Sequence, residues 1–122
     1  MVRLALSFAN EFLLNVTCFD ACNIDSDCLY IVQNIHRGYK VAGVDIIQTN
    51  TFAANAKKLE FHGLAEQVCE INAAGVRLAR EVAVDDIFVA GSVGPIETSP
   101  FSNEFSAEEV GRAFQEQMEG LV

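Results

Sequence analysis

Two short polar segments are the parts of this 122-residue chain best suited to binding a ligand. The first is Gln48-Thr49-Asn50-Thr51, and the second is Gly91-Ser92-Val93-Gly94-Pro95. Hydroxyl and amide groups orient polar substrates, and a glycine lets a ligand approach the backbone. The same residue types are also common in turns. The residues alone therefore allow two interpretations, a substrate-lining surface or turns at strand ends, and turns are the more frequent case.

Other catalytic chemistry finds little support in the residue spacing. The glycine segment has neither the dinucleotide-binding nor the Walker A spacing that binds phosphate. His36 and His62 lie in helical stretches, and no Ser, Cys or Asp is arranged as a triad partner for them. We therefore expect both to be surface or helix-packing histidines.

The cysteines form no recognisable metal site either. Structural zinc usually takes paired Cys-x-x-Cys hooks, which this sequence lacks. The four cysteines are Cys18, Cys22, Cys28 and Cys69. Because the chain is rich enough in aliphatic residues to fold without cross-links, we expect reduced thiols, a cytoplasmic location and no metal bound by this chain.

The composition narrows the range of partners. Asp and Glu number 17 against 8 Lys and Arg, which gives a formal net charge of −9. This charge repels phosphate backbones and anionic membrane surfaces, so we expect no nucleic acid and no membrane partner. No apolar run reaches the roughly 18–20 residues needed to span a bilayer. The N-terminal apolar stretch is too short for a signal peptide because Asn10 and Glu11 interrupt it.

The elements that must position the two polar segments alternate between helix and strand. Helical spacing over 27–42, followed by Gly43, predicts a helix, and the β-branched run over 44–51 predicts a strand buried on both faces. A short helix over 54–62 ends at Gly63. The inward face of the first helix comprises Cys28, Val32, Ile35, Tyr39 and Ala42.

The second half of the chain repeats this alternation. A long helix over 64–82 carries Gly75 on its inner face, where glycine permits close packing against the sheet, and a strand follows over 87–91. Ser106 and Glu109 form a capping box that opens a last helix. Its predicted inward residues are Val110, Phe114, Met118 and Leu121. Leu4–Phe8 and Phe12–Val16 are short apolar runs that fit either strand or helix.

Alternation of this kind predicts an α/β fold with a parallel sheet and right-handed crossovers. Three strands cannot close into a barrel, for which parallel folds use eight. We therefore expect about the first three βα units of a larger architecture, a partial TIM (β/α)8 barrel. In such folds the ligand lies beyond the C-terminal ends of the strands, where both polar segments fall.

Two motifs give the sequence a specific resemblance. Residues 42–52 read AGVDIIQTNTF, and residues 89–95 read VAGSVGP. With the shorter matches IHRGY at 35–39, EIN at 70–72 and VRLARE at 76–81, the sequence resembles the homocysteine S-methyltransferase family over about residues 23–122. This family includes the homocysteine-binding domain of methionine synthase and bifunctional proteins joined to a methylenetetrahydrofolate reductase.

The resemblance implies a (β/α)8 barrel that transfers a methyl group to the thiol of homocysteine and gives methionine. In the family, three cysteines near the ends of later strands hold a zinc ion that lowers the pKa of the thiol. The methyl donor is a methylfolate, methylcobalamin or S-methylmethionine. Residues carried over by motif as pocket-lining, substrate-binding candidates are Thr49, Asn50, Thr51, Phe52, Ser92, Gly94 and Pro95; no catalytic residue is assigned.

Two departures from the family pattern limit the assignment. We expect residues 1–122 to be an N-terminal part of the family's domain. Within them residues 1–22 match the family poorly, because Leu4 to Thr17 lack the Gly-rich turn that follows its first strand. The four cysteines match none of the zinc ligands.

We therefore expect a fragment that is inactive alone. One alternative is a non-enzymatic module completed by a partner chain, with self-association through the open sheet edge. A small doubly wound nucleotide binder is a weaker one.

Overall fold

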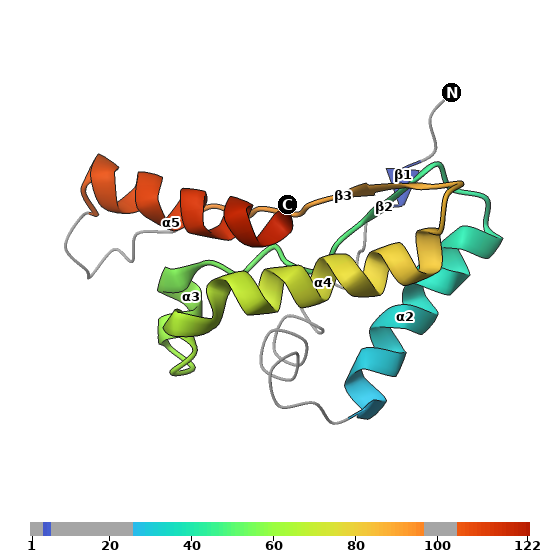
Figure 1. The fold of residues 1–122 in the computed structure, drawn as a ribbon, viewed down its shortest axis with the longest axis horizontal. Coiled ribbons are helices and arrows are strands. Elements are labelled where there is room, and N and C mark those ends of the chain that lie inside the picture. The colour runs from blue at the N-terminus through green and yellow to red at the C-terminus, as the bar shows by residue number, and fades with distance from the viewer. Residues whose placement is uncertain (1–3, 6–25, 97–104) are drawn as a thin grey trace.

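A computed structural model describes residues 4–5, 26–96 and 105–122 of the chain (Figure 1). In these residues three short strands form one parallel sheet in the order β1-β2-β3. The strands are β1 (Leu4–Ala5), β2 (Ile46–Gln48) and β3 (Phe88–Ala90). The predicted α/β class and parallel sheet are confirmed, and Leu4–Ala5 resolves as strand. Phe12–Val16 lies outside the described residues.

Helix α2 (Ser26–Val41) leads into β2. It ends where the predicted stop lies, because Gly43 takes a φ of 77° and its N–H donates to the Lys40 carbonyl at 2.9 Å. Val32 and His36 are buried on this helix, whereas Ala42, which we expected to face inward, is exposed. Burial therefore follows the face toward helix α4 (Val68–Ala83).

A short helix and a 3₁₀ turn connect β2 to α4. Asn55 caps α3 (Ala56–Glu60) by accepting the Lys58 N–H, and the turn η2 occupies Ala65–Gln67. The predicted helix over 64–82 is thus a 3₁₀ turn followed by α4. Apolar side chains of this region form one cluster, comprising Ala53, Ala54, Leu59, Val68 and Ile71.

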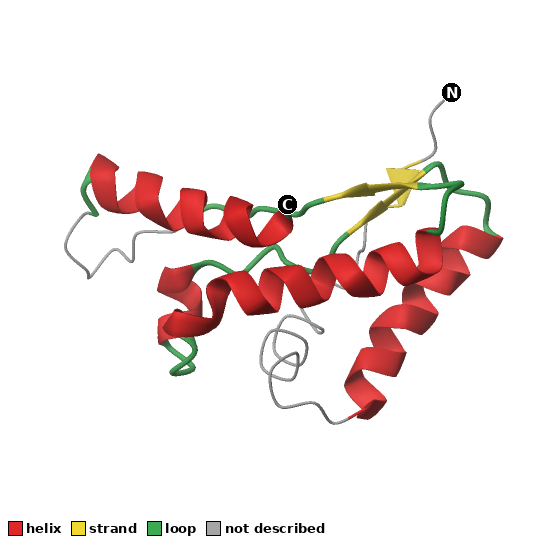
Figure 2. Cartoon of the chain, viewed as in Figure 1, coloured by secondary structure: helices red, strands yellow, loops and turns green. Residues whose placement is uncertain are grey.

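Helices α2 and α4 lie on the same side of the sheet (Figures 1 and 2). Ile47 packs there against Ala79 and Val82 of α4. The neighbours of Ile47 in the strand, Ile46 and Gln48, are only half-buried, and Phe88 opposite Ile46 is 77% exposed. The expectation of a strand buried on both faces is therefore wrong for β2, because within the described residues helices cover one face only.

The last helix, α5 (Ala107–Leu121), runs alongside α4 (Figure 1). Its predicted capping box is present, with the Glu109 N–H donating to Ser106 Oγ and the Ser106 N–H donating to the Glu109 carboxylate. Its predicted inward face is wrong at Met118, which is exposed, whereas Val110, Phe114 and Leu121 are half-buried. The fully buried residues of the helix are Ala113, Gln117 and Gly120.

The reason is close packing between the two helices. A Cβ on Gly120 would lie 2.8 Å from the Cα and carbonyl oxygen of Cys69, so α5 presents small and amide side chains to α4. No helix in the described ranges is both long and apolar enough to cross a membrane.

Candidate functional site

The two predicted polar segments lie next to each other, immediately beyond β2 and β3. These strands pair in parallel with Gln48 opposite Ala90, and the Thr49 N–H extends the ladder by donating to the Ala90 carbonyl at 2.9 Å. Both segments therefore leave the sheet at the same edge. This is the edge at which parallel α/β proteins bind their ligands.

Three residues of these segments form a closed ring of hydrogen bonds. The Ser92 N–H donates to Thr49 Oγ1 at 2.9 Å, and Thr51 Oγ1 donates to the Ser92 carbonyl at 2.8 Å. The Thr49 and Thr51 hydroxyl oxygens are 2.7 Å apart. Because Thr51 has one hydroxyl proton and gives it to Ser92, Thr49 must donate to Thr51. The ring fixes the spacing of the two segments.

The ring uses most of the hydrogen-bonding capacity of the predicted residues. Thr49, Thr51 and Ser92 are 2%, 0% and 4% exposed. Ser92 Oγ also accepts a hydrogen bond from Gln48 Nε2 at 2.9 Å. These contacts supply the turn chemistry that the sequence left open as one interpretation. A substrate-lining role for the same residues remains a prediction.

Phe52 and Gly94 join the segments a second time. The Gly94 N–H donates to the Phe52 carbonyl at 2.9 Å. A Cβ on Gly94 would lie 2.5 Å from that carbonyl and 2.8 Å from the Phe52 ring, so only glycine fits here. Lys58 Nζ lies 5.8 Å from the ring centroid. The Phe52 ring therefore lies beside Gly94 and near a cation.

Asn50 of the first segment and Phe52, which directly follows it, are half-buried. They alternate along the chain with Thr49 and Thr51, which are buried. Asn50 and Phe52 are consequently the side chains of this segment best placed to meet a ligand, and Pro95 is exposed at the end of the other segment.

Two amide side chains outside the predicted set also reach this edge. Gln117 Nε2 of α5 donates to the Thr51 carbonyl at 2.8 Å, and Asn72 Nδ2 of α4 donates to the Ala54 carbonyl at 2.7 Å. Neither residue was predicted from the sequence as part of the site. Asn72 falls within the EIN match, but Gln117 carries no motif that could have marked it.

The described residues do not fit a zinc site of the expected family type. No three His, Cys, Asp or Glu side chains among them converge on one point. Cys69 is exposed, and its thiol donates to the Glu116 carbonyl at 3.5 Å. Cys18, Cys22 and the side chain of Cys28 lie outside the described part of the chain.

The histidines are not part of the strand-end site. His36 is a helix-packing residue, and burial lowers the pKa of its imidazole. Its Nε2 is buried and has no hydrogen-bond partner within the described ranges. His62 lies on the surface. The two expected environments, surface and helix packing, are both found.

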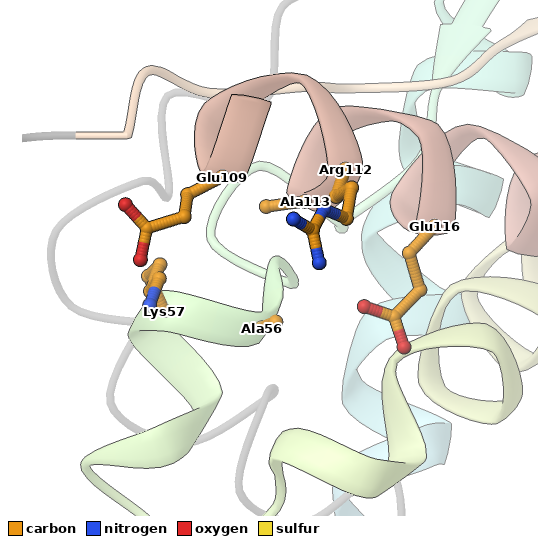
Figure 3. A pocket seen from close by; sticks show the side chains of 6 residues that line it. All are labelled: Ala56, Lys57, Glu109, Arg112, Ala113 and Glu116. Atoms are coloured by element: carbon orange, nitrogen blue, oxygen red, sulfur yellow. The ribbon is translucent and has the colours of Figure 1, made fainter. Parts of the chain in front are cut away.

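A separate cavity of about 280 Å³ lies between α3 and α5 (Figure 3). It is lined by Ala56, Lys57, Glu109, Arg112, Ala113 and Glu116. Two of its charged side chains have bonded partners, since Glu109 belongs to the Ser106 capping box and Arg112 is bonded to Glu108 at 2.8 Å. The bonds from Ser106, and more weakly the nearby Lys57 and Arg112, lower the pKa of the Glu109 carboxyl.

Comparison with known protein families gives one match over almost the whole chain. The sequence profile described as "Homocysteine S-methyltransferase" matches residues 4–122. The match includes residues 4–22, in which the sequence analysis found no motif of that family.

Similar proteins carry related names. The chain is 30% identical to methionine synthase of Mycobacterium leprae (strain TN) over 99 residues, which are 75% of this chain and 8% of that protein. It is 38% identical over 96 residues to betaine–homocysteine S-methyltransferase 1 of Bos taurus and 40% identical over 94 residues to that of Danio rerio. Each match covers 75% of this chain and 23% of the animal protein. The chain thus spans less than a quarter of these relatives.

Proposed function

Because this chain belongs to the homocysteine S-methyltransferase family, we propose that it forms part of an enzyme that methylates the thiol of homocysteine and produces methionine. The chain spans a small share of each relative, so this activity is assigned to a larger catalytic unit and not to these residues alone. We assign residues 1–122 as an N-terminal part of the homocysteine-binding domain, acting in the cytoplasm.

The sheet supports this assignment to a partial (β/α)8 barrel. Its three parallel strands follow one another in sequence order, with α2 and α4 on one face. Consecutive βα units of a barrel have this order. Ile46 and Phe88 would then face the interior of the barrel.

The observation that carries the proposed substrate site is the union of the two strand-end segments. The hydroxyl ring joins Thr49 and Thr51 to Ser92, and the bond from Gly94 to Phe52 repeats the connection. We propose that the ring serves as the floor of the homocysteine pocket. Asn50 and Phe52 are then the side chains of this segment that contact substrate, through the amide and the ring face.

We propose that this chain does not supply the zinc ligands of the family, since its described residues do not provide a ligand set. Its role is to shape the pocket and to orient the substrate. By itself it should form no methionine from homocysteine with S-methylmethionine, betaine or methylfolate as donor. Methionine produced by the purified chain, or zinc retained after dialysis near one equivalent, would contradict this part of the proposal.

A segment exchange tests the function directly. Residues 4–122 replace the matched segment of the bovine betaine–homocysteine S-methyltransferase, and methionine formation from homocysteine and betaine is measured. We expect the chimera to be active, and we expect Asn50→Ala in the chimera to weaken homocysteine binding. A chimera that folds, as judged by circular dichroism and a single sedimenting species, but binds no homocysteine would overturn the proposed function.

The alternative, a module completed by a partner chain, rests on a different observation. Phe88 of β3 is 77% exposed, and β3 is an edge strand of the described sheet. An uncovered edge and an exposed aromatic side chain favour association with another strand. Sedimentation of the isolated chain over a range of concentrations distinguishes this case, because a monomer at every concentration argues against self-association.

A further inference from the structure

The chain folds back sharply after β2, and this turn is held by two side chains from distant helices. Residues Thr51 to Ala54 form a β-turn in which the Ala54 N–H donates to the Thr51 carbonyl at 3.0 Å. Gln117 Nε2 donates to the same Thr51 carbonyl, 66 positions earlier in the sequence. Asn72 Nδ2 donates to the Ala54 carbonyl. The first and last carbonyls of the turn are therefore both bound.

The two amide groups also bind each other, and their donors are fully used. Gln117 Nε2 gives its second proton to Asn72 Oδ1 at 3.3 Å. Asn72 Nδ2 gives its second proton to the Val68 carbonyl at 2.7 Å within α4. Since each amide nitrogen has two protons, neither can donate to anything else. The two hydrogen-bonded amides thus link α5 and α4 to each other and to the turn.

The orientation of the Gln117 amide follows from its surroundings. Rotating the group by half a turn would place Oε1 against the Thr51 carbonyl and Asn72 Oδ1, which are both acceptors. In the observed orientation Oε1 is buried without a partner in the described part of the chain. A fully buried side chain that leaves an acceptor unpaired carries a cost. Gln117 therefore keeps its hydrogen bond to the Thr51 carbonyl although this orientation leaves its own Oε1 unpaired among the described residues.

The turn contains a residue of the proposed homocysteine pocket. Phe52 is the second residue of the turn, and Asn50 immediately precedes the turn. The Phe52 carbonyl accepts the Gly94 N–H, so the orientation of the peptide planes around Thr51 and Phe52 also sets the position of the second strand-end segment. We propose that Gln117, acting with Asn72, is a positioning residue that orients the Thr51–Ala54 turn for homocysteine binding. This inference rests on the proposed function for its substrate.

The first part of the experiment requires no enzymatic activity. In the full 122-residue chain, hydrogen exchange by NMR is compared between the parent, Gln117→Met and the control Gln115→Met. Gln115 lies on the same helix, is exposed and bonds only to Glu119 among the described residues. We expect the Ala54 and Gly94 amides to exchange about tenfold faster in Gln117→Met, as the loss of one hydrogen bond would give. Unchanged exchange at both amides would overturn the positioning role.

The second part separates this inference from the proposed function. In the bovine chimera, Gln117→Met should raise the KM for homocysteine by about tenfold and leave kcat within about twofold, while Gln115→Met changes neither. If the turn loosens but KM is unchanged, Gln117 is structural only and the inference fails while the proposed function stands. If the parent chimera folds but binds no homocysteine, the proposed function fails and the inference fails with it.

A second variant covers the case in which Gln117→Met does not fold. Gln117→Glu keeps the shape, and its carboxyl can donate to the Thr51 carbonyl only when protonated. Burial should keep this carboxyl protonated at low pH and oppose its ionisation. We expect the KM of the Gln117→Glu chimera to rise with pH relative to the parent. A parallel pH profile in the two proteins would overturn the inference.

Discussion

Helix α4 approaches the end of β2 so closely that Gly75 and Thr51 leave no room for one extra methyl group. A Cβ on Gly75 would lie 2.5 Å from Cγ2 of Thr51. Thr51 is therefore held from several directions, since its hydroxyl bonds to Thr49 and Ser92 and its carbonyl accepts from Gln117. The predicted site is built on this residue, which has no freedom to adapt.

Replacing Gly75 by alanine should destabilise the protein. The added methyl group must displace Thr51 or α4, which costs about 1–3 kcal/mol in a packed core. Gly111→Ala is the matched control, because Gly111 is also helical and nothing lies within 4 Å of its added Cβ. There alanine should stabilise by about 0.5–1 kcal/mol. Urea unfolding of both variants should give opposite signs, and two changes of the same sign would contradict the contact.

Thr51→Val should cost more stability than Thr51→Ser. Valine keeps the shape but removes the hydroxyl, which leaves the Ser92 carbonyl without its hydroxyl donor and the Thr49 hydroxyl proton without an acceptor, at a cost of about 1–3 kcal/mol. Serine keeps the hydroxyl and loses one buried methyl group, worth about 0.8 kcal/mol. The measurement is the free energy of unfolding of each variant. The reverse order would mean that packing, and not the hydroxyl ring, holds the two segments together.

Local signals in the sequence were enough to predict most of the elements. Gly43 and the Ser106 capping box act within one turn of their own helix, so they mark its end or start in any tertiary context. The meeting of the two polar segments followed from strand polarity alone, because the ends of adjacent parallel strands must lie at one edge. The sequential order of the strands also agrees with the expected topology.

The inward face of α5 could not be predicted in this way. Apolar periodicity selects Phe114 and Met118, but the helix buries Gln117 and Gly120. That choice depends on the Thr51 carbonyl and the backbone at Cys69, which are brought to α5 only by the tertiary fold. The hydroxyl ring was equally hidden, because it depends on the register that places Gln48 opposite Ala90.

Val84→Gly should stabilise the chain. Val84 ends α4 with a φ of 54° and a ψ of −135°, a backbone conformation that a β-branched residue rarely adopts. Such strain costs on the order of 1–3 kcal/mol, which exceeds the entropy that glycine adds to the unfolded chain. Thermal unfolding should show a higher midpoint for Val84→Gly than for Val84→Ala, since alanine keeps the Cβ. A lower midpoint for the glycine variant would show that Val84 is not strained.

The stability of the chain should fall as the pH falls below about 6.5 because of His36. Burial lowers the pKa of this imidazole in the folded state, so the unfolded chain binds a proton more readily. The contribution is fully present above the unfolded pKa and is lost on acidification until the folded pKa is reached, by at most about 1.4 kcal/mol per pH unit. The check is urea unfolding between about pH 5.5 and 7.5, where carboxyl groups contribute little. His36→Leu should flatten this dependence, and an equal slope in both proteins would assign it to other groups.

If the isolated chain self-associates as the alternative proposes, Phe88→Thr should weaken that association without unfolding the chain. Phe88 stands on the sheet face that carries no helix and is 77% exposed, so its ring contributes little to the stability of the monomer. Threonine keeps the β-propensity of the strand and removes the aromatic surface. Phe61→Thr is the control, because Phe61 is 88% exposed but follows α3, away from the sheet. Sedimentation equilibrium should show a weaker dimer for Phe88→Thr only. Equal weakening by both variants would mean that association depends on general apolar exposure and not on the uncovered sheet.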